Sequence, residues 1–115
     1  MKKNDAIVII GGAGELGRSF VRACIKEGMI VYVLDSCEKE VWENFRIKCD
    51  SFIRTDINNT NSLKKAIKII ATDSNKISCV INTSYPKNKN FGKDINNITV
   101  KDFNDNVNLH LGGYF

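Results

Sequence analysis

Four glycines within seven residues form the part of this sequence best suited to binding chemistry. They lie in the segment Gly11-Gly12-Ala13-Gly14-Glu15-Leu16-Gly17, which contains both G-x-G-x-x-G and G-x-x-G-x-x-G. Glycine permits a tight turn, and its missing Cβ lets a pyrophosphate approach the backbone. A helix that begins in this turn adds free N–H donors and a partial positive charge. The pattern therefore predicts a dinucleotide site, provided that a strand precedes the turn and a helix follows it.

Two carboxylates further along the chain could complete this site. Asp35 lies 18 residues after Gly17, near the spacing at which an acidic side chain accepts hydrogen bonds from the adenosine ribose. A 2′-phosphate would place a second anion against Asp35, and no Lys or Arg immediately follows it, so the sequence favours NAD over NADP. Asp56, which precedes Ile57, could accept a hydrogen bond from an adenine amino group or could equally cap the next helix.

Short apolar runs alternate with helical segments and place these residues in βαβ units. Strands are expected at Ala6–Ile10, Ile30–Leu34, Phe52–Thr55 and Ile77–Ile81. The glycine turn follows the first strand directly, and Asp35 follows the second. We therefore predict a Rossmann-like α/β fold with a parallel sheet, strand order 3-2-1-4, and helices on both faces.

Helical periodicity fills the segments between these strands. The first helix follows the glycine turn and stops at Gly28, a second is capped by Ser36, and a third spans Ser62–Ala71. A long polar loop over residues 82–97 precedes a last helix, which Thr99 caps with Asp102 three residues on. The side chains expected to face inward are Leu16, Phe20, Ala23, Cys24, Val41 and Phe45 with Trp42 beside them, Leu63, Ile67, Ile70, Phe103, Val107, Leu111 and Tyr114.

Length and composition narrow the class of protein. A chain of 115 residues is expected to form one domain over residues 1–115. With 43% hydrophobic and 26% charged residues it is neither disordered nor membrane-embedded. Its apolar runs fall far short of the ~20 residues that cross a bilayer, so we expect a cytoplasmic chain with no membrane partner.

The charged and metal-binding residue types are scattered along the chain. The 17 basic residues do not cluster, although they exceed the 13 acidic ones, and this argues against a nucleic-acid partner. No C-x-x-C pair occurs, and His110 has no nearby cysteine in the sequence. We therefore expect no metal site and four reduced thiols, those of Cys24, Cys37, Cys49 and Cys79.

Together these residues resemble the N-terminal half of the short-chain dehydrogenase/reductase family, over essentially the whole chain. The resemblance implies NAD as the cofactor, bound by Gly11, Gly12, Gly14, Glu15, Leu16, Gly17, Asp35, Asp56, Ile57 and Asn82. Asn82 matches the first residue of the family's Asn-Asn-Ala-Gly segment, whereas Thr83 and Ser84 depart from it. Ile10 stands where the family usually has Thr before the glycines, which puts one turn-stabilising hydrogen bond in doubt.

The C-terminal segment carries a second part of the resemblance. Val107-Asn108-Leu109 followed by Gly112 resembles the family's segment around its active-site Asn, which maps to Asn108. In the family this helix holds a water joined to the catalytic Lys, so Asn108 is expected to face the cofactor crevice. Residues 85–92 and 108–115 are also similar to bacterial short-chain oxidoreductases of surface-sugar and flagellin-modification pathways.

The resemblance also implies what this stretch of chain lacks. The family's catalytic Ser and Tyr-x-x-x-Lys lie beyond Phe115, so the fold is expected to be incomplete, as a fragment or a shortened reading frame. Tyr85 and Lys89 fit the Tyr-x-x-x-Lys spacing, but Pro86 disfavours helical geometry at Tyr85.

Two functions remain open at this point. The leading one is the NAD(H)-binding portion of a short-chain oxidoreductase that acts on an alcohol or ketone. Lys87, Lys89 and Lys93 could bind a phosphorylated or nucleotide-linked sugar as substrate, but a solvated charged loop is the favoured interpretation of these three residues. The alternative is a non-catalytic NAD-binding sensor or interaction module. A homo-oligomer is expected, with the exposed sheet edge at Ile77–Ile81 and the apolar side of the helix over Phe103–Tyr114 as its contact surfaces.

Overall fold

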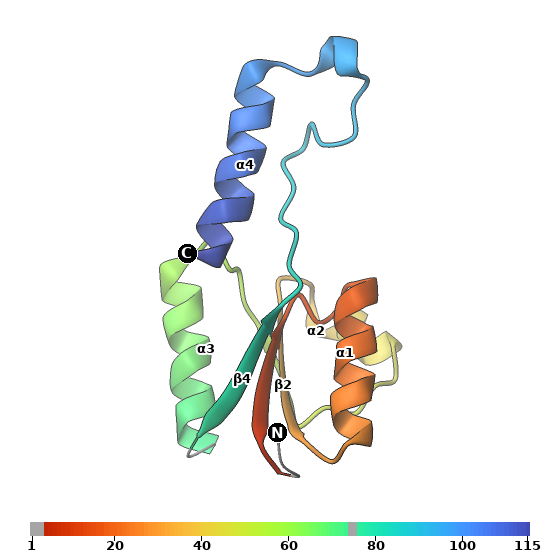
Figure 1. The fold of residues 1–115 in the computed structure, drawn as a ribbon, viewed down its shortest axis with the longest axis vertical. Coiled ribbons are helices and arrows are strands. Elements are labelled where there is room, and N and C mark those ends of the chain that lie inside the picture. The colour runs from red at the N-terminus through yellow and green to blue at the C-terminus, as the bar shows by residue number, and fades with distance from the viewer. Residues whose placement is uncertain (1–3, 74–75) are drawn as a thin grey trace. The chain divides into compact units, whose positions relative to one another are not determined.

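A computed structural model describes residues 4–73 and 76–115 of the chain. The chain forms two compact units, Met1–Ser84 and Tyr85–Phe115. The elements of the first unit, labelled in Figure 1, are β1 (Ala6–Ile10), α1 (Glu15–Lys26), β2 (Ile30–Asp35), α2 (Lys39–Asn44), β3 (Ser51–Arg54), α3 (Thr60–Asp73) and β4 (Ile77–Asn82). The second unit contains a 3₁₀ helix, η1 (Ile95–Asn97), and α4 (Val100–Tyr114).

The four strands form one parallel sheet in the order β3-β2-β1-β4, which confirms the predicted fold. The register pairs Ile10 with Leu34 on one side and with Asn82 on the other, and it pairs Asp35 with Arg54. The carboxyl ends of all four strands therefore meet along one edge. The strand order reverses at β1, and this is where α/β sheets bind their ligands.

Helices cover both faces of the sheet, as Figure 1 shows for the first unit. Ile7 and Ile9 of β1 face α1 and α2, where they pack with Val21, Cys24 and Trp42. Ala6 and Val8 alternate with them and pack on the opposite face with Ala66 and Ile70 of α3. Burial on both faces explains why β1 is an unbroken apolar run.

The buried stripe of α1 differs from the one expected from the sequence. Cys24 is buried as predicted, but the other buried residues are Gly17 and Val21. The predicted inward residues Leu16, Phe20 and Ala23 are all exposed. The reason is the close approach at Gly17, where a Cβ would stand 2.2 Å from the Gly11 carbonyl oxygen. The helix meets the glycine turn through its smallest residue, and the large side chains of Leu16 and Phe20 point outward.

Two other helices also bury residues that differ from the predicted ones. In α3 the buried residues are Ala66 and Ile70, whereas Ile67 is exposed and Leu63 is half-buried. Here too a small residue lies at the contact, and its larger neighbour faces away.

In α2, Trp42 is buried and stacks on Phe52 of β3 with ring centroids 5.6 Å apart, while Val41 is exposed and Phe45 is half-buried. The predicted cap by Ser36 is wrong, because the helix begins after Glu38 and has no side-chain cap.

The last helix, α4, begins as predicted and packs less than predicted. Thr99 and Asp102 form a reciprocal capping box at its start. Phe103, Leu111 and Tyr114 are exposed rather than inward, and α4 buries no residue at all. The second unit contains one α-helix and no strand, so it offers little apolar surface for these side chains. Within the described residues, no helix is both long and apolar enough to cross a bilayer.

Candidate functional site

The glycine turn joins the end of β1 to the start of α1, and its shape depends on glycine at specific positions. Gly11 has φ +75°, and a Cβ there would lie 2.6 Å from the backbone nitrogen of Ser84. A Cβ on Gly12 would lie 2.5 Å from a methyl group of Val33. With the 2.2 Å approach of Gly17 to Gly11, the turn is packed against β2, the end of β4 and α1 at once. At Gly11 and Gly17 no larger residue fits without moving the backbone, and at Gly12 the Val33 side chain would have to move.

The outer side of the turn is open. Gly14, Glu15 and Leu16 are exposed, and the Gly14 N–H donates to the Gly11 carbonyl oxygen at 3.1 Å. Gly14 is the N-cap of α1 and provides no side chain to cap the helix. The first turn of an α-helix has N–H groups without intrahelical partners, and these bind phosphate oxygens well. The turn therefore fits the pyrophosphate of a dinucleotide.

Asp35 lies at the end of β2, where its carboxylate connects two backbone segments. One oxygen accepts a hydrogen bond from the Ala13 N–H in the glycine turn at 3.0 Å, and the other accepts from the Cys37 N–H at 3.0 Å. The carboxylate is half-buried and fixed in position beside the turn. Each oxygen keeps a further lone pair for a ribose hydroxyl, so the arrangement fits the predicted ribose contact.

Cys37 lies next to this carboxylate, and its acidity reflects that position. Burial is the largest influence on its thiol, and the negative charge of Asp35 adds to it. Together they raise the pKa of Cys37 to about 11. The thiol is therefore protonated at neutral pH and is a weak nucleophile.

The end of β4 is tied to the glycine turn by a contact that the sequence pattern does not predict. Thr83 donates its hydroxyl to the carbonyl oxygens of Ile10 at 2.9 Å and Gly11 at 3.1 Å. The Thr83 N–H also donates to Ile10 at 2.8 Å. A hydroxyl at position 83 thus stabilises the start of the turn, where Ile10 lacks one. The sequence shows only that Thr83 departs from the family's segment; its contact with Ile10 depends on β4 lying beside β1.

Asn82 stabilises the same glycine turn indirectly, through Ser84. Its side-chain oxygen accepts hydrogen bonds from the N–H of Ser84 at 2.9 Å and from the Ser84 hydroxyl at 2.6 Å. This fixes the Ser84 backbone, which lies where a Cβ of Gly11 would be. Asn82 therefore lies at the predicted site and shapes it, and its contact with a cofactor stays a prediction.

Asp56 does not cap the next helix. Its carboxylate accepts from the Asn58 N–H at 2.9 Å, whereas Asn59 caps α3 by accepting from the N–H groups of Asn61 and Ser62. Asp56 is exposed and Ile57 is half-buried, two and three residues after the end of β3. The adenine contact remains a prediction for both residues.

Arg18 was not singled out from the sequence, although it directly follows the last glycine. Its guanidinium donates to the Ala13 carbonyl oxygen and lies 4.1 Å above the ring of Phe45. It therefore links the glycine turn, α1 and the end of α2. Ala13 is held by Arg18 at its oxygen and by Asp35 at its nitrogen.

The predicted catalytic residue lies in the second unit. Asn108 is an exposed residue of α4, and its active-site role stays a prediction. Tyr85 and Lys89 lie in a non-helical segment, so they do not share a helix face as the family's Tyr-x-x-x-Lys pair does. The Tyr85 ring instead packs against His110, with centroids 4.0 Å apart, and against Phe91.

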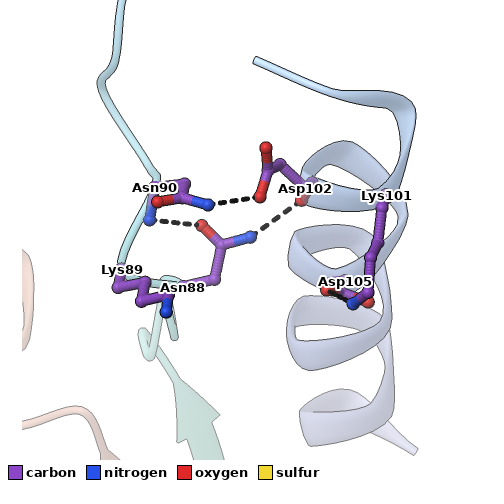
Figure 2. Close-up of a pocket in the computed structure, with 6 residues that line it drawn as sticks. All are labelled: Asn88, Lys89, Asn90, Lys101, Asp102 and Asp105. Carbon is purple, nitrogen blue, oxygen red and sulfur yellow. Dashed lines mark hydrogen bonds and ion pairs between the residues drawn. The ribbon is translucent and has the colours of Figure 1, made fainter. Parts of the chain in front are cut away.

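A pocket lined by polar and charged residues also lies within the second unit (Figure 2). Asn88 donates from its side chain to the Asp102 carbonyl oxygen at 2.8 Å, and the Asn90 amide donates to the Asp102 carboxylate. Hydrogen bonds from Asn90 and Thr99 hold the pKa of Asp102 at about 2, below its usual range. These contacts fasten the Asn-rich segment to the start of α4.

Comparison with known proteins gives a consistent result. Residues 8–104 match the sequence profile of the 3-beta hydroxysteroid dehydrogenase/isomerase family. The chain is 28% identical over 122 residues to post-translational flagellin modification protein A of Campylobacter coli, covering 99% of this chain and 47% of that protein. This match agrees with the similarity noted in the sequence.

Solved structures show the same fold. A short chain dehydrogenase from Bacillus anthracis has a TM-score of 0.82 at 24% identity, covering 98% of this chain and 46% of that one. A short chain dehydrogenase from Leptospira borgpetersenii with bound NAD+ has a TM-score of 0.72 at 19% identity, covering 99% and 43%. The chain therefore spans about half the length of the relatives it matches.

Proposed function

Because this chain belongs to the 3-beta hydroxysteroid dehydrogenase/isomerase family, within the short-chain dehydrogenases/reductases, we propose that it is the NAD(H)-binding portion of an oxidoreductase. The observation that carries the proposal is the Asp35 carboxylate, which is hydrogen-bonded to Ala13 inside the glycine turn. This contact places an open helix N-terminus and a fixed acid side by side. A pyrophosphate and an adenosine ribose need this combination.

Different residues would bind different parts of the dinucleotide. The first turn of α1 would hold the pyrophosphate, Asp35 the ribose hydroxyls and Asp56 the adenine amino group. Bound NAD(H) would supply hydride exchange at its nicotinamide. The described residues bind and orient this group. Gly11 and Gly17 let the backbone approach closely, and Thr83 and Arg18 hold the turn in shape.

For the complete reaction we propose an alcohol or ketone substrate, with a sugar derivative as the preferred class. The support is the likeness to the Campylobacter coli flagellin modification protein over nearly the whole chain. We propose a cytoplasmic location, because a reducing compartment suits four free thiols.

Isothermal titration calorimetry of the chain with NAD+ and NADH tests the binding proposal. We expect saturable binding that Gly17→Val abolishes, because its side chain would collide with the backbone of Gly11 and Gly12. Ala23→Val is the matched control, since it adds the same side chain at an exposed position of α1. Its affinity should equal that of the unsubstituted chain.

Gly17→Val could also fail to fold, so a second variant keeps the test decisive. Asp35→Asn removes the negative charge but keeps one side-chain oxygen as an acceptor for the backbone N–H groups of Ala13 and Cys37. It should weaken NAD+ binding at least tenfold, with helix content checked by circular dichroism. A folded chain that binds neither nucleotide would refute the proposal, as would Asp35→Asn binding NAD+ with unchanged affinity.

A further inference from the structure

Arg54 is the direct neighbour of Asp35 in the sheet. The register of β2 and β3 pairs the two residues, each at the carboxyl end of its strand. Paired residues on neighbouring strands send their side chains to the same face of a sheet. A cation 19 positions away in sequence is thus placed beside the acid that the ribose is proposed to meet.

The guanidinium of Arg54 is already engaged by the loop that follows Asp35. Its Nε donates to the Ser36 carbonyl oxygen at 3.3 Å, and one terminal nitrogen lies 2.8 Å from the Glu38 carboxylate. Both side chains of the ion pair are more than half exposed, at 60% for Arg54 and 59% for Glu38. The pair therefore borders open solvent next to the proposed adenosine end of the site.

We propose that the Glu38–Arg54 ion pair is a specificity determinant for the 2′ position of the adenosine ribose, an inference that rests on the proposed dinucleotide function. While Glu38 holds Arg54, the acids Asp35 and Glu38 outnumber the one cation, which suits the neutral 2′-hydroxyl of NAD. Once Glu38 loses its charge, Arg54 becomes available to a 2′-phosphate. Arginine binds phosphate well through its planar set of donors.

The expected size of the effect follows from the exposure of the pair. Two unit charges about 4 Å apart in water interact with an energy of about 1 kcal/mol. A free-energy difference of this size corresponds to roughly a fivefold change in affinity. Glu38→Gln should therefore raise the affinity for NADP+ relative to that for NAD+ about three- to fivefold. Screening of exposed charges should shrink this gain as the salt concentration rises.

The test measures Kd for NAD+ and NADP+ on the 115-residue chain by calorimetry at low and high salt. Glu40→Gln is the matched control, because it makes the same charge change in the first turn of α2. Glu38 caps α2 without a side-chain hydrogen bond, so the Gln substitution removes no helix cap. In the double variant Glu38→Gln/Arg54→Gln, the affinity for NADP+ relative to that for NAD+ should return to that of the unsubstituted chain.

Each alternative outcome has a clear meaning. A gain that survives in the double variant, or one that Glu40→Gln reproduces, would overturn the role of Arg54. NAD+ binding with no change in the relative affinity for NADP+ on Glu38→Gln would overturn this inference and leave the proposed function standing. A chain that binds neither nucleotide would overturn both.

Discussion

Asp35 contributes to structure before it contributes to binding. Its two oxygens accept hydrogen bonds from Ala13 in the glycine turn and from Cys37 in the next loop. A charged acceptor that pairs with backbone N–H groups in a half-buried position stabilises the fold by about 1.5–3 kcal/mol for each bond. The residue that would recognise the ribose thus also fixes the turn that would bind the pyrophosphate. A site built in this way is preorganised, since binding need not order either part.

The glycine turn requires glycine more strictly at position 11. Replacing Gly11 by Ala imposes a left-handed backbone on a residue with a Cβ and drives that Cβ within 2.6 Å of Ser84. The left-handed conformation costs about 1–2 kcal/mol and overpacking about 1–3 kcal/mol more, so the free energy of unfolding should fall by about 3 kcal/mol. Urea denaturation followed by circular dichroism measures the loss.

Gly92→Ala separates the two costs of that substitution. Gly92 also has a positive φ of +85°, but a Cβ there would meet nothing within 4 Å. Its replacement should cost only the conformational part, about 1 kcal/mol. Equal losses for the two variants would show that the close approach of Gly11 to Ser84 contributes nothing.

At the level of elements, the sequence predicted the order and type of the structure well and the contact faces of its helices poorly. Strand runs such as Ala6–Ile10 are apolar on both faces and easy to recognise. Helix α1 instead approaches the glycine turn through Gly17, and α3 packs on the sheet through Ala66 and Ile70, because small residues allow the closest approach. The periodicity of apolar residues depends mainly on large side chains such as Leu16. It therefore predicted that the neighbouring stripe of α1 is the buried one.

The site, too, has a part that the sequence could predict and a part that depends on the fold. Its glycine spacing and Asp35 could be identified because they are close in sequence and each has a chemical reason for its type. Arg54 could not, because its proximity to Asp35 comes from the β2–β3 register. The role of Thr83 likewise depends on β4 lying beside β1, which brings its hydroxyl to Ile10.

The start of α4 should respond to pH through Asp102. Its carboxylate accepts hydrogen bonds from Asn90 and Thr99, which lower its pKa from 3.8 to about 2. A depressed folded-state pKa gives stability that is present above the unfolded value and is lost as pH falls toward the folded value. The helix should therefore loosen between about pH 4 and pH 2. Backbone amide shifts of residues 99–102 in NMR spectra follow this directly.

Asp102→Asn should remove that pH dependence, because the amide does not titrate. Asp105→Asn is the control on the same helix, since Asp105 pairs with Lys101 rather than with the cap. It should retain the loss between pH 4 and pH 2. Titration of the cap that persists in Asp102→Asn would assign the effect to another group.

At the scale of the whole molecule, β4 is an edge strand of the sheet. Val80 is 56% exposed and Ile77 is 38% exposed on this strand. An edge strand presents unpaired backbone groups, and apolar side chains along it favour pairing with a further strand. The sheet has two edge strands, β3 and β4, and in the 115-residue chain we expect β4 of one copy to pair with β4 of a second copy.

We therefore expect the isolated chain to self-associate through β4, and Val80→Lys to shift it toward monomer. A lysine on an edge strand opposes pairing because two copies would bring like charges together. Val41→Lys is the matched control, since Val41 is 44% exposed on α2 and should leave association unchanged. Sedimentation velocity over a range of concentrations distinguishes these cases. A chain that stays monomeric at every concentration would contradict the prediction, and so would equal association of the two lysine variants.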